Sequence, residues 1–360
     1  MAFMQLDERG LVSLDDPQVI ENLLPELAAQ KVLTGLNDGK SPIFEDRKRD
    51  ITPRMLMNHT YGGGHSCFNP LLFEYLGGAS NAVNEATDPH QTALDSPLLW
   101  QPGTHTNYGQ GFDWLAVLIE RLTKTSLDKH LSENIFAPLG LRDIGFEDTF
   151  GGNITSRESS KGKFWPRNMR QPDGTIVPID PPVLVNPERP LAYPKGKYHT
   201  FPLGTGLAAT ASEVARLHTI MLPENAGVDP VTGHRLLAAS SVKEISSPQL
   251  SEALRNDTRF TDSSIDMMFK VADLAAPHVD PAGTYGLGCA IQGVDRVLKD
   301  GRKGRSKGSV YWYGAANTEF WIDGEKGIVV FVNGNYLPWN DEAWLDFVAG
   351  VEGLLYEGLA

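Results

Sequence analysis

The chain has 360 residues, 41% of them hydrophobic, and contains no apolar run long enough to span a bilayer. Its net charge of −13, from 45 acidic and 32 basic residues, argues against broad binding to nucleic acids or anionic membranes. Two cysteines, Cys67 and Cys289, are too few for a disulfide framework and indicate a reducing compartment. We therefore expect a cytoplasmic globular protein of one large domain or two closely packed ones.

The start of the chain predicts the second half of an amphipathic helix rather than a secretory signal. Residues 2–9 show no basic end followed by an apolar core, and Gly10 suits the position just past a helix end. Pro17, which follows a capping aspartate, predicts the first turn of a short helix over 18–30, interrupted at Pro25.

The next stretch combines a surface connection with a capped helix. Residues 40–50 are polar, with mixed charges, and predict a connection at the surface. Thr52 and Pro53 predict the cap and the first turn of a helix over 51–60. Two further short helices are predicted over 69–76 and 79–85.

Two possible ligand sites near residue 60 lack the surroundings that they need. The glycines at 62–64 have neither a preceding strand nor the Gly-Lys-Ser/Thr of a phosphate loop. His59, His65 and Cys67 carry metal-ligating side chains, but no second cluster follows at metal-site spacing. We therefore expect neither a metal nor a cofactor.

A Pro- and Gly-rich turn over 101–111 leads through Tyr108 into an apolar helical repeat that ends near Thr123. The repeat comprises Phe112, Leu115, Ile119 and Leu122. Tyr108 therefore lies where a loop meets a helix, a position that can hold a side chain rigidly while its tip stays free. Taken alone, the segment more often indicates a tyrosine that only packs.

The middle of the chain alternates helices with one long irregular segment. A helix is predicted over 126–134. Residues 150–200 are rich in Pro, Gly and charge and show little periodicity, which is typical of a lid or binding insertion. A glycine turn at 204–206 and a Thr or Ser cap predict a helix over 211–221.

The last quarter changes to a strand pattern and ends in a helix. Four strands joined by glycine-containing turns are predicted over 285–291, 309–313, 317–323 and 327–333. An amphipathic helix over 340–356 closes the chain. Its expected buried face comprises Trp344, Phe347, Val348, Val351 and Leu355. Middle helices followed by an antiparallel sheet predict an α+β fold.

Four segments, each weak alone, carry a resemblance through their order. They are I-T-P-R-M-L-M-N-H-T at 51–60, P-G-T-H-T-N-Y at 102–108, F-A-P-L-G-L at 136–141 and G-L-A-A-T-A-S at 206–212. Together they resemble the serine penicillin-binding and class C β-lactamase-related family, over nearly the whole chain. Residues 24–27, 68–70 and 108–114 look most like its fungal branch, which includes transesterases that acylate statin-type polyketides, together with related esterases.

The resemblance implies a β-lactamase/transpeptidase-like fold, with an antiparallel sheet flanked by terminal helices. We assign one domain to residues 1–360, with a mostly helical subdomain over 51–225 that contains the irregular insertion over 150–200. The sheet strands and the closing helix occupy 280–360. By this resemblance, we expect the N-terminal strands of the family to be missing from the sequence.

The resemblance also implies covalent acyl transfer. The serine of a Ser-x-x-Lys attacks an ester or thioester, while the lysine and a tyrosine move protons. Tyr108 matches that tyrosine, and a nearby lysine would have to lower its pKa from the usual value of about 10. The third family motif falls on Trp312-Tyr313-Gly314, and the backbone N–H groups of Ala315 and the nucleophile would form the oxyanion hole.

Two departures from the family pattern affect the expected substrate. Gln110 stands where the family has Asn, so its polar contact to the substrate or to the lysine is expected to be longer. Trp312 replaces a cationic or imidazole residue that holds the carboxylate in β-lactamases. Its replacement favours a neutral acyl or polyketide substrate over a β-lactam. The alternative for Trp312 is a strand aromatic that packs in the core.

No Ser-x-x-Lys precedes Tyr108. Matches at 126–129, 160–163 and 240–243 all follow it, contrary to the family order, and we assign none as the nucleophile. The family motif would lie on the helix that ends at 2–9, roughly ten residues before Met1. Either the recorded start truncates an active enzyme, which we favour because missing strands leave a sheet edge unpaired, or the chain lacks its nucleophile.

As recorded, the enzyme is therefore catalytically incomplete. We predict an acyltransferase or esterase of secondary metabolism, which acts through an acyl-serine on a small acyl donor and a hydroxylated acceptor. The alternative is a non-catalytic relative that binds an acyl ligand. A basic loop predicts a dock for an acidic acyl-carrier domain, or otherwise a solvated hairpin tip. The loop contains Arg296, Lys299, Arg302, Lys303, Arg305 and Lys307.

Overall fold

The computed structural model describes residues 1–65, 69–77, 94–146, 168–178, 203–204, 207–256, 280, 282–314, 316–339 and 341–359. The helices are α1 (Ala2–Glu8), α2 (Gln18–Leu23), α3 (Pro25–Ala28), α4 (Pro53–Met57), α5 (Pro70–Tyr75), α8 (Gly111–Thr123), α9 (Leu127–Leu131), the π-helix η2 (Ser132–Phe136), α10 (Ala211–Thr219), α11 (Ala239–Ile245), α12 (Glu252–Asn256) and α13 (Glu342–Gly358). The strands are β1 (Val32–Leu36), β2 (Pro42–Glu45), β3 (Ile144–Gly145), β4 (Asn168–Arg170), β5 (Ile176–Pro178), β6 (Ala208–Ala209), β7 (Thr284–Tyr285), β8 (Ala290–Ile291), β9 (Val310–Gly314), β10 (Thr318–Asp323), β11 (Ile328–Asn333) and β12 (Tyr336–Leu337). Among the described helices, none has the length and hydropathy needed to cross a membrane.

The predicted helix boundaries are largely confirmed, and their capping residues explain why. The Thr52 side chain accepts a hydrogen bond from the Met55 N–H, and the Thr210 side chain accepts one from the Glu213 N–H. Gly10 follows α1 with a φ of +67°, the left-handed conformation that ends many helices. The predicted helix over 79–85 and most of the segment over 150–200 lie outside the described residues.

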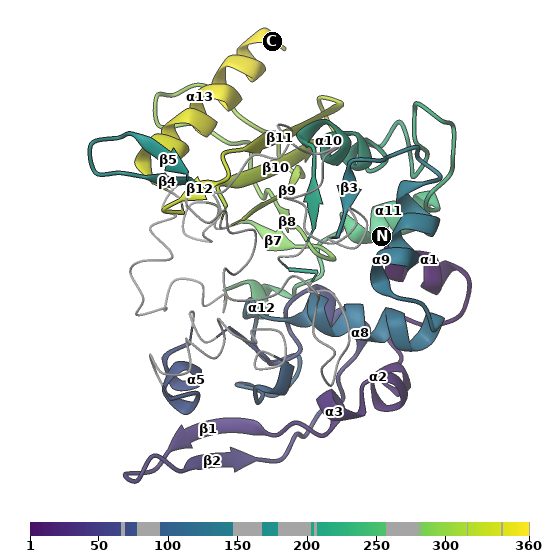
Figure 1. The fold of residues 1–360 in the computed structure, drawn as a ribbon, viewed down its shortest axis with the longest axis vertical. Coiled ribbons are helices and arrows are strands. Elements are labelled where there is room, and N and C mark those ends of the chain that lie inside the picture. The colour runs from purple at the N-terminus through teal and green to yellow at the C-terminus, as the bar shows by residue number, and fades with distance from the viewer. Residues whose placement is uncertain are drawn as a thin grey trace.

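A five-stranded antiparallel sheet in the order β11-β10-β9-β8-β7 forms the centre of the molecule (Figure 1). Strands β9, β10 and β11 confirm three of the four predicted strands. The fourth prediction, one strand over 285–291, is wrong, because this segment forms the two short strands β7 and β8. Gly288 adopts a φ of +92° between them, so the chain reverses where a continuous strand was expected.

The two faces of the sheet pack against different helices. On β10, Glu319, Trp321 and Asp323 are buried on the face that packs against α13. Phe320, which alternates with them, faces the other way and stacks on His218 of α10 at 4.3 Å between ring centroids. Because successive side chains of a strand point to opposite faces, β10 packs against α13 on one face of the sheet and against α10 on the other.

Helix α13 covers its face of the sheet with residues spaced by four. Its buried residues include Trp344, Val348, Glu352 and Tyr356. The prediction that Phe347 lies on the buried face is wrong, because its side chain is 54% exposed. Buried residues spaced by four lie close to one face of the helix, and position 347 lies outside that face.

A buried ion cluster links α13 to the sheet. Arg305 is fully buried, and its Nη2 donates to Glu319 Oε1 at 2.8 Å and to Glu352 Oε2 at 2.9 Å. Its guanidinium carbon lies 4.5 Å from the centroid of the Trp321 ring. Arg296 contributes a second cation, 3.6 Å from Glu352. The predicted basic surface over 296–307 is therefore smaller than expected, because two of its arginines balance buried carboxylates.

Removing one partner from this cluster should destabilise the fold strongly. We expect Glu352→Gln to lower the free energy of unfolding by about 3–5 kcal/mol, because it leaves the Arg305 charge buried and under-compensated. Urea unfolding measures this change. The control is Asp300→Asn, which breaks the exposed Asp300–Arg302 pair and should have little effect. Equal effects of the two substitutions would contradict the role of the cluster.

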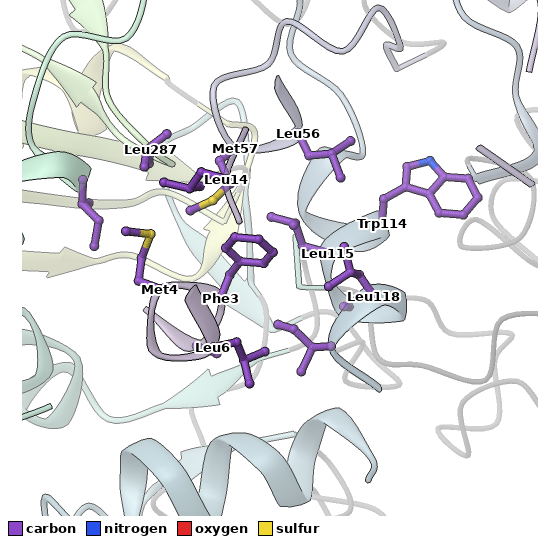
Figure 2. Packing of buried hydrophobic residues seen from close by; sticks show 14 of the residues in the cluster. Phe3, Met4, Leu6, Leu14, Leu56, Met57, Trp114, Leu115, Leu118 and Leu287 are labelled. Atoms are coloured by element: carbon purple, nitrogen blue, oxygen red, sulfur yellow. The ribbon is translucent and has the colours of Figure 1, made fainter. Parts of the chain in front are cut away.

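The helical part of the molecule packs around α8. Figure 2 shows Phe3 of α1 pointing toward Leu115 of α8, with Leu14 and Met57 nearby. Phe112 at the start of α8 reaches the sheet, since a Cβ on Gly288 would lie 2.7 Å from its ring. These contacts fix the beginning of α8 between the N-terminal helices and the β7–β8 turn.

The hairpin β1–β2 was not predicted. Residues 40–50 were expected to form a surface connection, but Pro42–Glu45 pairs with Val32–Leu36 in antiparallel register. Ile43 and Phe44 are 49% and 40% exposed. Because successive residues of β2 are exposed alike, the hairpin has no alternation of apolar and polar residues from which it could be recognised.

Candidate active site

The loop that carries Tyr108 is bound to the turn that follows α4. The Asn107 N–H donates to the His59 carbonyl at 2.9 Å, and the Gly103 N–H donates to the Thr60 carbonyl at 2.7 Å. Asn107 adds a side-chain bond from Nδ2 to the Gly63 carbonyl at 3.2 Å. The backbone just before Tyr108 is therefore fixed by a segment that is distant in sequence.

Glycines allow this close approach. A Cβ on Gly64 would lie 2.2 Å from Nδ2 of Asn107. A Cβ on Gly111 would lie 2.1 Å from the carbonyl oxygen of Leu56, where α8 begins against α4. The glycines at 62–64 therefore allow tight packing against the Tyr108 loop. This role agrees with the absence of a phosphate-loop pattern around them.

Aromatic rings surround Tyr108. Its ring centroid lies 4.8 Å from that of His59, 5.3 Å from that of His65 and 5.5 Å from that of Trp312. Tyr285 continues the cluster, with its ring edge-on to Trp312 at 5.4 Å. The fold therefore brings the two sequence-predicted residues Tyr108 and Trp312 into contact, although they lie far apart in the chain.

Three members of this cluster were missed as site residues by sequence reasoning. His59 and His65 were considered only as metal ligands, and Tyr285 only as a strand residue. In the part of the chain that the structure describes, no group of His, Cys, Asp or Glu side chains is placed to hold a metal ion. The signal that could have found His59 is its place in the family-like segment over 51–60.

Both imidazoles near Tyr108 are neutral at ordinary pH. Burial, with a smaller contribution from His65, lowers the pKa of His59 to about 3. Burial lowers the pKa of His65 to about 4. The Gln110 Nε2 lies 2.6 Å from His65 Nδ1, and because an amide nitrogen only donates, His65 must accept there. Neither histidine therefore supplies the positive charge that would make the Tyr108 phenol more acidic.

The remaining predicted residues lie near the end of β9. Trp312 pairs with Phe320 and Tyr313 pairs with Glu319 across the β9–β10 ladder, so their side chains start from opposite faces of the sheet. The Trp312 and Tyr313 rings nevertheless stack at 5.1 Å. Gly314 ends the strand, and Ala315 lies outside the described residues. The oxyanion role of Ala315 therefore stays a prediction.

The Ser-x-x-Lys matches have ordinary structural roles where the structure describes them. The Ser126 side chain accepts from the Lys129 N–H at 3.3 Å and caps α9. Ser240 is exposed in the first turn of α11. The match over 160–163 lies outside the described residues.

A buried carboxyl group lies on the first turn of α8. Asp113 is 9% exposed, and its Oδ1 accepts from the Gly204 N–H at 3.3 Å. Burial raises the pKa of Asp113 to about 6, although hydrogen bonds from the backbone of Gly204 and Leu203 favour its charged form. This carboxyl group ties the segment at 203–204 to the helix that follows Tyr108.

The raised pKa of Asp113 predicts a loss of stability with rising pH. The unfolded chain ionises this group near pH 4 and the folded chain near pH 6, so its contribution is present at low pH and lost as pH rises through 6. We expect a loss of about 2 kcal/mol between pH 4 and pH 7.5. Unfolding curves of the wild type and Asp113→Asn over this range, with Asp300→Asn as control, measure it. An unchanged pH dependence in Asp113→Asn would contradict this origin.

Comparison with known proteins finds one matching family and relatives that are named as an acyltransferase and an esterase. A family model described as Beta-lactamase matches residues 1–352. Monacolin J acid methylbutanoyltransferase from Aspergillus terreus is 28% identical over 362 aligned residues, which cover 98% of this chain and 78% of that protein. Lovastatin esterase from Penicillium rubens is 36% identical over 146 residues, 41% of this chain and 36% of the esterase. A solved structure of a mutant simvastatin synthase (LovD) from Aspergillus terreus superposes with a TM-score of 0.75 at 28% identity, covering 99% of this chain and 78% of that one.

Proposed function

The chain belongs to the Beta-lactamase family, and on that premise we propose an acyltransferase or esterase that acts on a small hydroxylated natural product through an acyl-serine intermediate. The observation that carries the proposal is the contact between Tyr108 and Trp312 at 5.5 Å, because it joins two predicted motif positions in one site. The similar proteins are named as acyltransferases and an esterase, which favours catalysis over a ligand-binding role.

In the proposed mechanism Tyr108 acts as the proton carrier. The serine hydroxyl attacks the acyl carbonyl, its proton passes to the phenolate, and the bond to the leaving alcohol or thiol breaks as that group takes the proton. The acceptor alcohol then repeats these steps in reverse order. The backbone N–H groups of Ala315 and of the nucleophile would stabilise the oxyanion, and Gln110 would orient the polar end of the substrate.

The substrate proposed for this site is a neutral acyl group. Around Tyr108, the described rings of Trp312 and Tyr285 carry no charge, and burial keeps both neighbouring imidazoles neutral. Tyr313 extends the aromatic surface, with its ring 5.7 Å from that of Trp339. Flat apolar walls bind hydrocarbon and polyketide surfaces, whereas a β-lactam carboxylate would need a cation.

Tyr108→Phe should lower kcat by about 10²- to 10⁴-fold, because it removes the proton carrier and keeps the ring. The assay uses protein expressed from its complete gene, with a small acyl thioester and an alcohol acceptor. Treatment with a fluorophosphonate, followed by peptide mapping, should find the adduct on a single serine. The function fails if no acyl or phosphonyl adduct forms, and saturable binding without turnover would favour the ligand-binding alternative.

The acyl donor is proposed to arrive on an acidic acyl-carrier domain at the hairpin tip over 296–307. Lys299, Lys303 and Lys307 are exposed there. The proposed dock is therefore limited to these three lysines of the six basic residues in the predicted loop. Arg302 pairs with Asp300 at 2.6 Å, and Arg305 and Arg296 belong to the ion cluster. Complementary charge would steer a carrier domain to this tip.

Reversing the charge of Lys303 and Lys307 to Glu should therefore raise KM for a carrier-bound donor several-fold, with kcat unchanged. A small soluble thioester should keep its KM, which makes it the control for damage to the site. If KM for both donors changes alike, the hairpin tip is not the dock.

We propose a cytoplasmic location, because the chain has few cysteines and Cys289 is a free thiol. Cys289 is a free thiol, 6% exposed, and burial raises its pKa to about 12. A buried neutral thiol packs as a small apolar side chain. Cell fractionation with an antibody against the protein tests the compartment.

A further inference from the structure

His59 has an unusual backbone conformation for a buried residue. Its φ is +61°, in the left-handed region that favours glycine, and its side chain is only 4% exposed. A non-glycine residue in this region is strained, because its Cβ lies too close to the following carbonyl oxygen. Strain of this kind persists only where the surrounding structure imposes it, and such positions cluster at functional sites.

The strained conformation lets one residue hold Tyr108 in two ways. The His59 carbonyl accepts the hydrogen bond from the Asn107 N–H at 2.9 Å, which fixes the backbone next to Tyr108. The imidazole lies against the phenol, with 4.8 Å between centroids and 56° between the ring planes. Phe112 and Tyr285 confine the same imidazole from other sides, at 5.9 Å and 5.8 Å.

Ring contacts account for the placement of this imidazole. Among the hydrogen bonds that the structure describes, none involves the buried Nδ1 of His59. Its neutral state removes any charge effect on the phenol. Histidine is also one of the few residues that are enriched at left-handed positions, where bulkier aromatic residues are disfavoured. A position that needs both a flat ring and a positive φ is therefore suited to histidine.

We propose that His59 is a positioning residue for Tyr108 in the acyl transfer, an inference that rests on the proposed function. Its backbone carbonyl sets the loop, and its ring limits the rotation of the phenol, so that the phenolic oxygen stays aligned with the nucleophile and the acyl group. Small displacements of a proton carrier are costly, since a shift of about 1 Å can lower a rate by about 10²-fold.

His59→Asn is the informative variant, because Asn accepts the left-handed backbone but removes the ring. We expect kcat to fall about 10- to 100-fold, with KM for the donor unchanged. His59→Gly relieves the backbone strain completely and should show the same loss of kcat. Its unfolding temperature should be no lower than that of His59→Asn. His105→Asn is the matched control, because His105 lies in the same loop but stacks on Trp100 at 5.4 Å instead of on Tyr108.

Two readouts separate positioning from a structural role. In the Tyr108→Phe background, His59→Asn should have no further effect on kcat, because the residue that it positions no longer carries the proton. In protein labelled with 3-fluorotyrosine, the ¹⁹F resonance missing from Tyr108→Phe identifies Tyr108. That resonance should shift and narrow in His59→Asn, as the ring gains freedom, and stay unchanged in His105→Asn.

Additive effects of His59→Asn and Tyr108→Phe on kcat, or an unchanged Tyr108 resonance in His59→Asn, would overturn the inference. Absence of turnover in the wild type would instead defeat the proposed function. The resonance would then still decide whether His59 holds the ring.

Discussion

The start of α8 can reach the backbone of α4 because Gly111 carries no side chain, and the geometry of the site depends on this approach. Any Cβ at that position would lie 2.1 Å from the Leu56 carbonyl oxygen. With the two helices in contact, the turn after α4 lies beside the loop before α8, and the hydrogen bond from Asn107 to His59 can form. The phenol of Tyr108 then meets the sheet through Trp312. A larger residue at 111 would separate the helices and move Tyr108 away from β9.

The sheet side of the site is held by a different kind of interaction. Arg305 joins a strand carboxylate, Glu319, to a carboxylate of α13, Glu352, in a place with no solvent access. Glu319 pairs with Tyr313 on the neighbouring strand. The ion cluster therefore supports the strand that presents the aromatic wall. A buried ion pair adds little net stability over an apolar core, but losing one partner is costly, so it favours one arrangement of α13.

Around Tyr108, the described side chains form an aromatic and uncharged environment. Burial keeps His59 and His65 neutral and raises the pKa of Tyr285 far above its usual value. An uncharged wall binds apolar acyl groups without a large desolvation penalty, but it cannot promote ionisation of a phenol. Ionisation of Tyr108 would therefore need a cation from outside this cluster, whose residues supply position and shape.

The sequence by itself determined the elements whose signals are local. Capping threonines, the glycine after α1, the apolar repeat after Tyr108 and the strands β9–β11 between glycine-containing turns depend on neighbours within a few residues, and these predictions are confirmed. Motif order also identified the family and predicted that Tyr108 and Trp312 share one site. Only the tertiary structure decided the rest. Strand β2 of the hairpin is largely exposed and shows no alternation. Phe347 lies outside the buried stripe of α13, which is set by the packing of this helix on the sheet. Arg305 is buried by carboxylates that are distant in sequence. The roles of His59 and His65 beside Tyr108 likewise arise from contacts between segments, which a linear pattern does not contain.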